Sequence, residues 1–502
     1  MASTTFEIAR DGCHLSVFQR GAPVYFAAFM WKKIMVPETG PKKTVLYLTR
    51  YYTPSFSAAG IRAGRFVDAL SQSGHQVIVA TVGERACLKK PSEGTSEPCV
   101  CRVSGKGELP AELRSERLLP AWPWWKPLPG PDPDPKCSRA LFQVCHSLIQ
   151  HHKPDLIYVT GPPFSLLAVA CEVADICRLT LIVEMRDAWY SGMYWPYRTA
   201  RRRRLAREWE TRCLSDSDVI VTVTRTHKKI LQDNYPADVA EKIVNIPHSF
   251  DKSLLEEKQS HSNTEQQDRG QPCKKNFTIA YVGQVRGVEV TTESSGRRTL
   301  QGLNRWARLV LLGANFCEKL RLDWMSPIHL LRATAQLAKQ NAEFRERVRL
   351  VFVGQKYNEI DLLARQINLS ANVRQYGLQS PETAQRFVSQ ADLLVVNLYG
   401  IVGMDYHWCV PCKLYTYLGT QKPVLALLPP GEARDLVMRA GTGFVAEPDD
   451  VEAIAGVLES LFRQHQAGRI IVKPDRDFIR QFDLRHQQTR FVRVVESVSE
   501  HK

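Results

Sequence analysis

A strand–helix–strand pattern in residues 45–82 constrains the fold of this chain more than any other feature. Residues 45–49 and 77–82 are apolar runs of strand length. Between them lies a loop of small residues at 54–60, followed by a helix with one apolar face. Gly74 ends this helix. Two strands joined through a helix run parallel, so the pattern predicts an open α/β sheet. The small-residue loop then lies at a carboxyl strand end, where such sheets bind ligands.

The pattern occurs in two series, which predicts two α/β domains. A chain of 502 residues is too long for one core. A polar, apolar-poor stretch separates the two series and is typical of a linker. We therefore expect an N-terminal extension at 1–41, a first domain at 42–252, a linker at 253–275, a second domain at 276–470 with an insertion at 286–325, and a C-terminal helix at 471–502.

The composition is typical of an ordinary soluble globular protein, with 44% hydrophobic and 24% charged residues. No apolar run reaches the roughly 18 residues of a membrane span. Residues 22–36 are interrupted by Lys32 and Lys33 and lack the layout of a signal peptide. Thirteen scattered cysteines favour a reducing cytoplasm. The net charge of +15 favours anionic partners such as nucleotide diphosphates, anionic lipid or nucleic acid.

Two kinds of motif resemble metal ligands, yet neither predicts a metal site. Cys409 and Cys412 form one C-x-x-C, and Cys99 and Cys101 form one C-x-C. A zinc site would need two such pairs brought together. Residues 132–134 form a D-x-D among prolines rather than after a strand. They lie within residues 84–137, a polar, Pro-rich region that we predict to lie outside the sheet. We expect no metal.

The stretch VPCKLYTYLGTQKPVLA, residues 410–426, predicts a short helix that Gly419 ends, followed by a buried strand. It also resembles the P-x-K-L-x-E-Y-L-x-x-x-x-P-V-L-A segment of family 4 glycosyltransferases. The stretches SGHQVIVAT, RDAWY, NIPHSFD and TIAYVGQV resemble motifs of the same family in the same order. The resemblance covers roughly residues 44–251 and 276–465.

The resemblance implies the GT-B fold, with two doubly wound Rossmann-like domains facing a cleft. It implies a retaining, metal-independent hexosyltransferase that moves a sugar from a nucleotide diphosphate sugar to a glycan or lipid-linked acceptor, as in polysaccharide biosynthesis. The nucleotide sugar is then a co-substrate, and no cofactor is expected. Two alternatives remain open: a non-catalytic sugar-nucleotide or glycan-binding protein on the same fold, and a nucleotide-sugar epimerase.

On the donor side, the resemblance implies that Gly283 and Gly354 turn the chain beside the pyrophosphate. A helix that begins near Pro411 places Lys413 in its first turn, where an anion is favoured. The alternative is a solvent-facing lysine without a partner.

The family's acidic pair, which touches sugar and ribose, falls here at Trp408 and Thr416, and neither residue is acidic. Either donor recognition has changed, or the protein does not catalyse transfer. Thr416 could keep one weaker hydrogen bond to the ribose. Glu432, one helix later, could substitute for the missing carboxylate.

On the acceptor side, we expect Ser57, Gly60 and Arg62 to line the small-residue loop. Asp187 and Arg186 directly follow a predicted strand. We expect Asp187 to position the acceptor or share its proton, and Arg186 to bind phosphate. The alternative is a local ion pair that holds the following loop.

A helix rich in arginine is predicted at residues 198–207, which hold six arginines. It is either a solvated helix face or a contact for anionic membrane headgroups through Arg201, Arg202, Arg203 and Arg204. Nucleic-acid binding is disfavoured because no aromatic-rich or helix-turn-helix context accompanies the run. We expect a cytoplasmic protein that can associate with the membrane surface.

Overall fold

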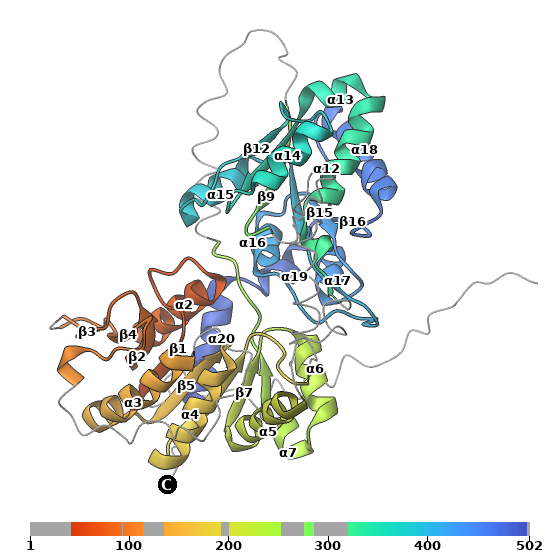
Figure 1. Ribbon diagram of the computed structural model, residues 1–502. Helices are drawn as coiled ribbons and strands as arrows, with labels where there is room; N and C mark the ends of the chain where they lie inside the picture. The colour runs from red at the N-terminus through yellow and green to blue at the C-terminus, as the bar shows by residue number, and fades with distance from the viewer. Residues whose placement is uncertain are drawn as a thin grey trace, which may run out of the picture. The chain divides into compact units, whose positions relative to one another are not determined.

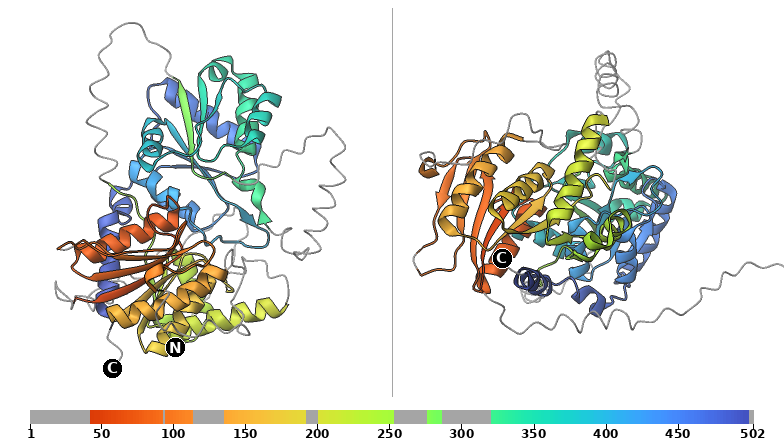
Figure 2. Two further views of the ribbon diagram at one scale, coloured as in Figure 1. Left: turned by 60° about the vertical axis from the view of Figure 1, so that its left-hand side comes forward. Right: turned by 90° about the horizontal axis from the view of Figure 1, so that it is seen from below.

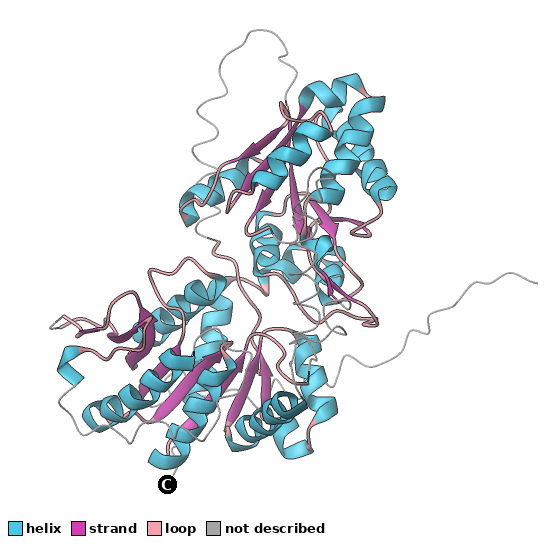
Figure 3. Ribbon diagram, in the orientation of Figure 1, coloured by secondary structure: helices cyan, strands magenta, loops and turns pink. Residues whose placement is uncertain are grey.

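The computed structural model describes residues 42–92, 94–113, 135–191, 200–252, 276–285 and 320–498. The N-terminal extension, the linker, the D-x-D at 132–134 and most of the 286–325 insertion lie outside these ranges. Within them, helices and strands alternate in two series, and each series is built around its own sheet (Figures 1 and 3).

The first sheet has eight strands in the order β3-β4-β2-β1-β5-β6-β7-β8. They are β1 (Thr44–Thr49), β2 (Gln76–Gly83), β3 (Cys87–Lys89), β4 (Cys99–Ser104), β5 (Leu156–Gly161), β6 (Thr180–Met185), β7 (Val219–Thr222) and β8 (Ile243–Asn245). All neighbouring strands are parallel except β3 and β4. The predicted parallel sheet is confirmed, and its chain order reverses beside β1.

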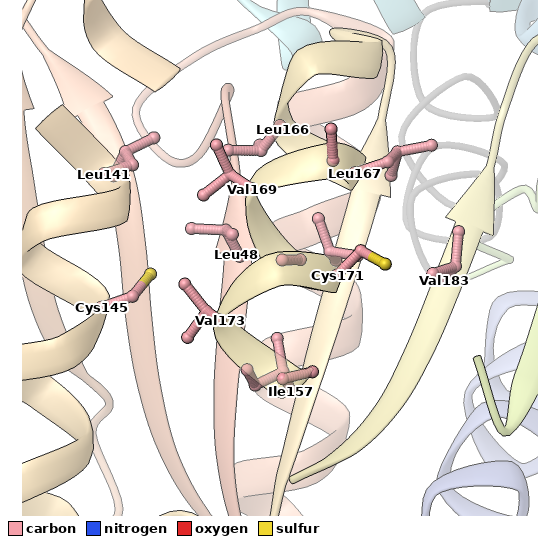
Figure 4. Packing of buried hydrophobic residues seen from close by; sticks show 14 of the residues in the cluster. Leu48, Leu141, Cys145, Ile157, Leu166, Leu167, Val169, Cys171, Val173 and Val183 are labelled. Atoms are coloured by element: carbon pink, nitrogen blue, oxygen red, sulfur yellow. The ribbon is translucent and has the colours of Figure 1, made fainter. Parts of the chain in front are cut away.

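Helices cover both faces of this sheet because the strands are apolar on both sides. The helices in this part of the chain are α2 (Ala58–Gln72), α3 (Pro135–His152), α4 (Phe164–Cys177), α5 (Ala200–Asp216), α6 (Arg225–Asn234) and α7 (Ala237–Glu241), with a 3₁₀ turn η2 (Ala111–Leu113). On one face Leu48, Ile157 and Val183 of three strands pack with Leu167 and Cys171 of α4 (Figure 4). The cysteine here behaves as a small hydrophobic residue.

The prediction that residues 84–137 lie outside the sheet is wrong for part of that region. β4 pairs in parallel with β2, and β3 adds an antiparallel edge strand. Cys99, Cys101 and Val103 of β4 are buried in the core. The strand escaped detection because its apolar run is short and Arg102 interrupts it.

The second sheet has six strands, all parallel, in the order β12-β11-β9-β13-β15-β16. They are β9 (Phe277–Val282), β11 (Val348–Val353), β12 (Val373–Gln375), β13 (Leu393–Asn397), β15 (Val424–Leu427) and β16 (Gly443–Ala446). A separate antiparallel pair joins β10 (Leu320–Arg321) to β14 (Gly400–Ile401). The chain order reverses beside β9, so the predicted second doubly wound domain is confirmed.

Two groups of helices sandwich the second sheet. One face holds α12 (Ile328–Gln340), α13 (Ala342–Arg347), α14 (Asn358–Gln366) and α18 (Val451–Gln466). The other holds α15 (Pro381–Gln390), α16 (Cys412–Thr420), α17 (Glu432–Arg439) and α19 (Arg476–Arg480). A short 3₁₀ turn η3 (Leu322–Met325) precedes α12. Within the described ranges, no helix combines the length and apolarity needed to cross a membrane.

The last helix, α20 (Leu484–Ser497), packs against the first domain (Figures 1 and 2). The ring of Phe491 stacks on that of Phe66 in α2, with centroids 4.0 Å apart. The Gln488 side-chain amide donates a hydrogen bond of 2.8 Å to the Arg65 carbonyl. The end of the chain therefore completes the first core.

Candidate functional site

Two glycine turns meet at the carboxyl edge of the second sheet. Gly283 follows β9 and Gly354 follows β11, and the Gly283 amide donates to the Val353 carbonyl over 2.8 Å. Their φ angles are +131° and +153°. A Cβ on Gly354 would lie 2.3 Å from the Gly283 carbonyl oxygen. The two backbones approach so closely that only glycine fits at position 354. Both predicted glycines therefore lie side by side at this edge of the sheet.

As predicted, Lys413 lies in the first turn of α16, two positions after the N-cap Pro411. Its Nζ is 3.6 Å from the centroid of the Tyr281 ring. The same atom would be 3.5 Å from a Cβ on Gly283. It is sealed from solvent and has no hydrogen-bond partner among the described residues. The side chain thus carries its ammonium group from the helix start to the glycine turns.

Burial lowers the pKa of Lys413 to about 7, and the neighbouring Cys412 opposes that shift only in part. The residue as a whole is half-buried, while its nitrogen is enclosed. The free amides of a helix N-terminus already form a positive end. An ammonium group without a counter-charge at this position destabilises the protein when no ligand is bound. Binding of an anion beside it would relieve that cost.

Helix α16 ends one residue later than predicted. Gly419 is still helical, the helix extends to Thr420, and Gln421 takes the left-handed φ of 55°. The phenol of Tyr417 fastens this helix to the sheet, because it accepts a 3.1 Å hydrogen bond from the Val282 amide next to Gly283. Tyr417 and Tyr281 both escaped the sequence analysis, since each belongs to an ordinary apolar pattern.

The two positions of the family's acidic pair lie in different surroundings. Trp408 is 1% exposed, and its ring is 5.8 Å from that of His227 on α6. Thr416 is half-buried on α16, one turn after Lys413. A hydroxyl that can accept a hydrogen bond therefore remains at one position, while the other is occupied by a buried indole, which can donate one but cannot accept.

Glu432 begins α17, and both oxygens of its carboxylate are engaged within the protein. Oε1 accepts a 2.9 Å hydrogen bond from the Arg225 amide, and Oε2 accepts one of 2.7 Å from the Thr226 amide. Both amides belong to the first turn of α6. We expected Glu432 to substitute for the missing carboxylate that contacts the nucleotide sugar. Its carboxylate instead contacts the first domain.

The small-residue loop of the first domain is held by its own polar groups. Ser57 caps α2, and its hydroxyl accepts a 3.1 Å hydrogen bond from the Gly60 amide. A Cβ on Gly60 would lie 2.7 Å from the Ser55 carbonyl oxygen. The prediction of a loop through residue 60 is wrong at its end: the loop stops at Ser57, and Gly60 and Arg62 belong to the first turns of α2, where the close approach to Ser55 requires glycine at position 60.

Arg62, the third residue of that group, is buried in a saturated network. Its Nε donates to the Glu184 carboxylate over 2.8 Å, and its two terminal nitrogens donate to the carbonyls of Pro247 (2.9 Å) and Ile246 (2.8 Å). The other Glu184 oxygen accepts from the Thr160 hydroxyl over 2.6 Å. The sequence contained no sign of this pair, whose members are 122 positions apart.

Arg186 and Asp187 follow β6, as predicted, and have different surroundings. Arg186 donates from Nε to the Thr160 hydroxyl over 2.9 Å and also to the Pro162 carbonyl, so it fastens the neighbouring loop. Asp187 is half-buried. Burial raises the pKa of Cys409, and the Asp187 carboxylate adds to that rise. Asp187 therefore lies close to the segment that leads into α16.

The predicted arginine-rich helix corresponds to α5. Arg201, Arg202, Arg203 and Arg204 are all exposed in its first turns. The helix is anchored further along by buried Trp209 and other apolar residues. Among the described residues, no three His, Cys, Asp or Glu side chains are grouped as metal ligands would be.

Two family models match the chain in sequence. A glycosyl transferase 4-like domain matches residues 57–247, and a glycosyl transferases group 1 domain matches residues 316–464. No curated protein matches the chain in sequence. The two matches fall on the two parallel sheets.

Solved structures share the fold over most of the chain. Anabaena Alr3699/HepE in complex with UDP and glucose has a TM-score of 0.55 at 14% identity, covering 91% of this chain and 100% of that one. Sucrose-phosphate synthase from Thermosynechococcus elongatus has a TM-score of 0.57 at 15% identity, with coverages of 90% and 98%. The α,α-trehalose 6-phosphate synthase from Burkholderia multivorans has a TM-score of 0.55 at 12% identity, with coverages of 91% and 99%.

Identities this low establish the fold alone, which is GT-B, as predicted. The family follows from the sequence matches, which place a 4-like domain and a group 1 domain in that order on the two sheets. The chain is a glycosyltransferase and belongs to the group 1, family 4-like glycosyltransferases.

Proposed function

We propose that the protein transfers a sugar from a nucleoside diphosphate sugar to a glycan or lipid-linked acceptor, with retention of anomeric configuration and without a metal. One observation carries the proposal: the enclosed ammonium group of Lys413, without a hydrogen-bond partner among the described residues, lies beside Gly283 at the start of α16. A buried charge without a partner is costly, and a bound diphosphate would remove that cost. One structural neighbour, Anabaena Alr3699/HepE, is solved in complex with UDP and glucose and in complex with UDP-glucose, which supports the same class of ligand here.

The chemistry assigns different tasks to the two domains. As the bond between sugar and diphosphate breaks, negative charge grows on the leaving phosphate. The Lys413 ammonium and the first amides of α16 stabilise that charge from fixed positions. Asp187, at the end of β6, orients the acceptor hydroxyl or takes its proton as the new bond forms.

Donor affinity in this reading is modest because the ribose meets a hydroxyl instead of a carboxylate. A neutral hydrogen bond from Thr416 contributes about 0.5–1.5 kcal/mol, against about 1.5–3 kcal/mol for a charged one. Trp408 is buried and has neither a charge nor an oxygen that could accept from a sugar hydroxyl. The main donor contacts are therefore those to the diphosphate.

The test is release of nucleoside diphosphate from a panel of nucleotide sugars, measured with and without a lipid or glycan extract as acceptor. We expect release from at least one donor, stimulated by the acceptor. The Asp187→Asn variant should bind the nucleotide normally and lose transfer. Nucleotide binding without any release would instead favour the non-catalytic binding protein. Release of free sugar without an acceptor requirement would favour hydrolysis or epimerase-like chemistry.

We also infer that the exposed arginines of α5 hold the protein at an anionic membrane surface. Arg201 to Arg204 are exposed around one end of an anchored helix, where Arg204 also pairs with Glu208 over 3.4 Å and Arg203 lies 5.8 Å from the centroid of the Tyr190 ring. Each contributes about 1 kcal/mol near anionic lipid and is screened by salt. Flotation with vesicles should therefore require anionic lipid and low salt.

A matched pair of variants tests this surface. Replacing all four arginines by alanine should abolish flotation, while replacing them by lysine should preserve it because the charge is kept. Equal flotation of both variants, or flotation with neutral vesicles, would contradict the inference.

A further inference from the structure

The N-terminus of α6 is capped from two directions. The hydroxyl of its N-cap, Thr224, accepts a 3.2 Å hydrogen bond from the His227 amide. The other two amides of the first turn, Arg225 and Thr226, donate to the Glu432 carboxylate over 2.9 and 2.7 Å. Glu432 lies 207 positions from Arg225, in the second domain. A carboxylate of the second domain thus caps the N-terminus of a helix in the first domain.

The Glu432 carboxylate is held rigidly by its own surroundings. Its residue is 8% exposed. The Glu432 amide donates to the His407 carbonyl over 3.1 Å, and the His407 amide donates to the Pro430 carbonyl over 2.9 Å. The adjacent Trp408 is buried with its ring 5.8 Å from that of His227. One compact segment of the second domain therefore supports the carboxylate and contacts α6.

The arrangement is favourable for clear physical reasons. A carboxylate at a helix N-terminus interacts with the positive end of the helix and satisfies amides that would otherwise lack partners. Hydrogen bonds to a charged group are about twice as strong as neutral ones. Two such bonds to one rigid carboxylate determine both the orientation of α6 and its distance from Glu432.

The N-terminus of α6 lies on the acceptor side of the first domain. α6 follows β7, and β7 is the parallel neighbour of β6, which ends just before Asp187. The start of α6 and Asp187 therefore lie at the same edge of the first sheet. In the second domain, α17 with Glu432 packs against α16, which carries Lys413.

We infer that Glu432 is a positioning residue: by capping α6 it aligns the acceptor side of the first domain with the donor side of the second for sugar transfer. The role rests on the proposed function. Glu432 acts through α6, and it does not touch the donor. This distinguishes it from the carboxylates of the family's acidic pair.

The test compares Glu432→Gln and Glu432→Ala with a matched control, Asp435→Asn. Asp435 is an exposed carboxylate in the first turn of the same helix, and it accepts from the Tyr406 hydroxyl, which also interacts with the Thr226 side chain of α6. Asparagine keeps an oxygen that can accept from Tyr406, so this control removes the charge and leaves that contact possible. We expect nucleoside diphosphate affinity to change less than about twofold in every variant. The kcat should fall about 10- to 100-fold in Glu432→Ala, less in Glu432→Gln, and little in the control.

A loss of nucleotide affinity with unchanged kcat would overturn the inference, since it would mean that Glu432 contacts the donor. An equal fall in kcat for Asp435→Asn would overturn it as well, because the effect would then be a general one on α17. Should Glu432→Ala fail to fold, Glu432→Gln keeps the size of the side chain and carries the test.

Amide hydrogen exchange separates this inference from the proposed function. In the protein without nucleotide, exchange at Arg225 and Thr226 should accelerate in Glu432→Ala and stay unchanged in Asp435→Asn. Unchanged exchange in both variants would disprove the cap whatever the enzyme does. Faster exchange in a protein that releases no nucleoside diphosphate would leave the cap standing and disprove the proposed function.

Discussion

Two buried cations, Arg62 and Lys413, lie near the carboxyl edges of the two sheets, one in each domain. Arg62 donates to the Glu184 carboxylate and to two backbone carbonyls. Lys413 has an aromatic ring beneath its nitrogen and no hydrogen-bond partner among the described residues. Both residues were predicted to serve the substrates. The hydrogen bonds of Arg62 are therefore made within the protein, whereas the Lys413 ammonium group has an aromatic ring beside it and no hydrogen-bond acceptor among the described residues.

The difference follows from the chemistry of the two side chains. A guanidinium group has a flat fork of donors that protein oxygens can saturate, and it stays charged when buried. An ammonium group is compact and loses its proton readily once it is desolvated. Removing a buried arginine whose donors are all engaged therefore leaves unpaired groups behind, while a desolvated lysine without an acceptor can gain from an anion beside it.

The largest expected effect comes from breaking the saturated pair. Arg62→Met leaves the Glu184 carboxylate buried without its cation, which should lower the free energy of unfolding by about 3–5 kcal/mol. Urea unfolding followed by circular dichroism measures it. The double variant Arg62→Met/Glu184→Met removes both charges and should recover part of the loss. A folded Arg62→Met protein of normal stability that has lost acceptor binding would reverse our assignment.

A smaller effect, on binding, should come from the unsaturated cation. Lys413→Met should weaken nucleoside diphosphate binding by about 1.5–3 kcal/mol, the range for a hydrogen bond to a charged group. Calorimetric titration with UDP and the other nucleoside diphosphates measures it. Lys339→Ala, which removes an exposed lysine at the end of α12, is the control and should bind normally. Equal affinities of Lys413→Met and wild type would remove Lys413 from the site.

A third difference between Lys413 and Arg62 should be proton uptake when the nucleoside diphosphate binds. Burial lowers the pKa of Lys413 to about 7, and a bound anion would raise it again because it favours the charged form. Binding above pH 7 should then take up a proton, and affinity should fall by up to about tenfold per pH unit. Titrations in buffers of different ionisation enthalpy measure the uptake. Lys413→Met should bind with no such uptake, and wild type behaving like this variant would contradict the prediction.

The smallest effect concerns stability without a ligand. In the folded protein the pKa of Lys413 is lowered to about 7, while an unfolded lysine titrates near 10.4. The folded state therefore binds fewer protons between these values, so the stability contributed by this group rises with pH across that window. Lys413→Met should stabilise the empty protein by about 1 kcal/mol near pH 6, and the gain should vanish near pH 10. Thermal melts at both pH values check the sign.

Much of the fold could be predicted because its signals are local. Apolar runs of strand length, helices with one apolar face and glycines at strand ends indicated two parallel sheets, and both sheets are present. The register of Lys413 in the first turn of α16 followed from Pro411 two positions before it. β4 was missed because Arg102 interrupts its apolar run, although that side chain reaches the Thr53 carbonyl outside the core.

The sequence by itself determined which residues stand at the edges of the sheets, because strand ends, glycine turns and helix starts depend on neighbours a few positions away. Only the tertiary structure decided what each of those residues contacts. Arg62 meets Glu184 across 122 positions, and Glu432 meets Arg225 across 207. No periodicity connects positions so far apart, since their contact depends on how whole strands and helices pack. The same packing encloses the Lys413 nitrogen beside Tyr281 and Gly283, far from either residue in sequence.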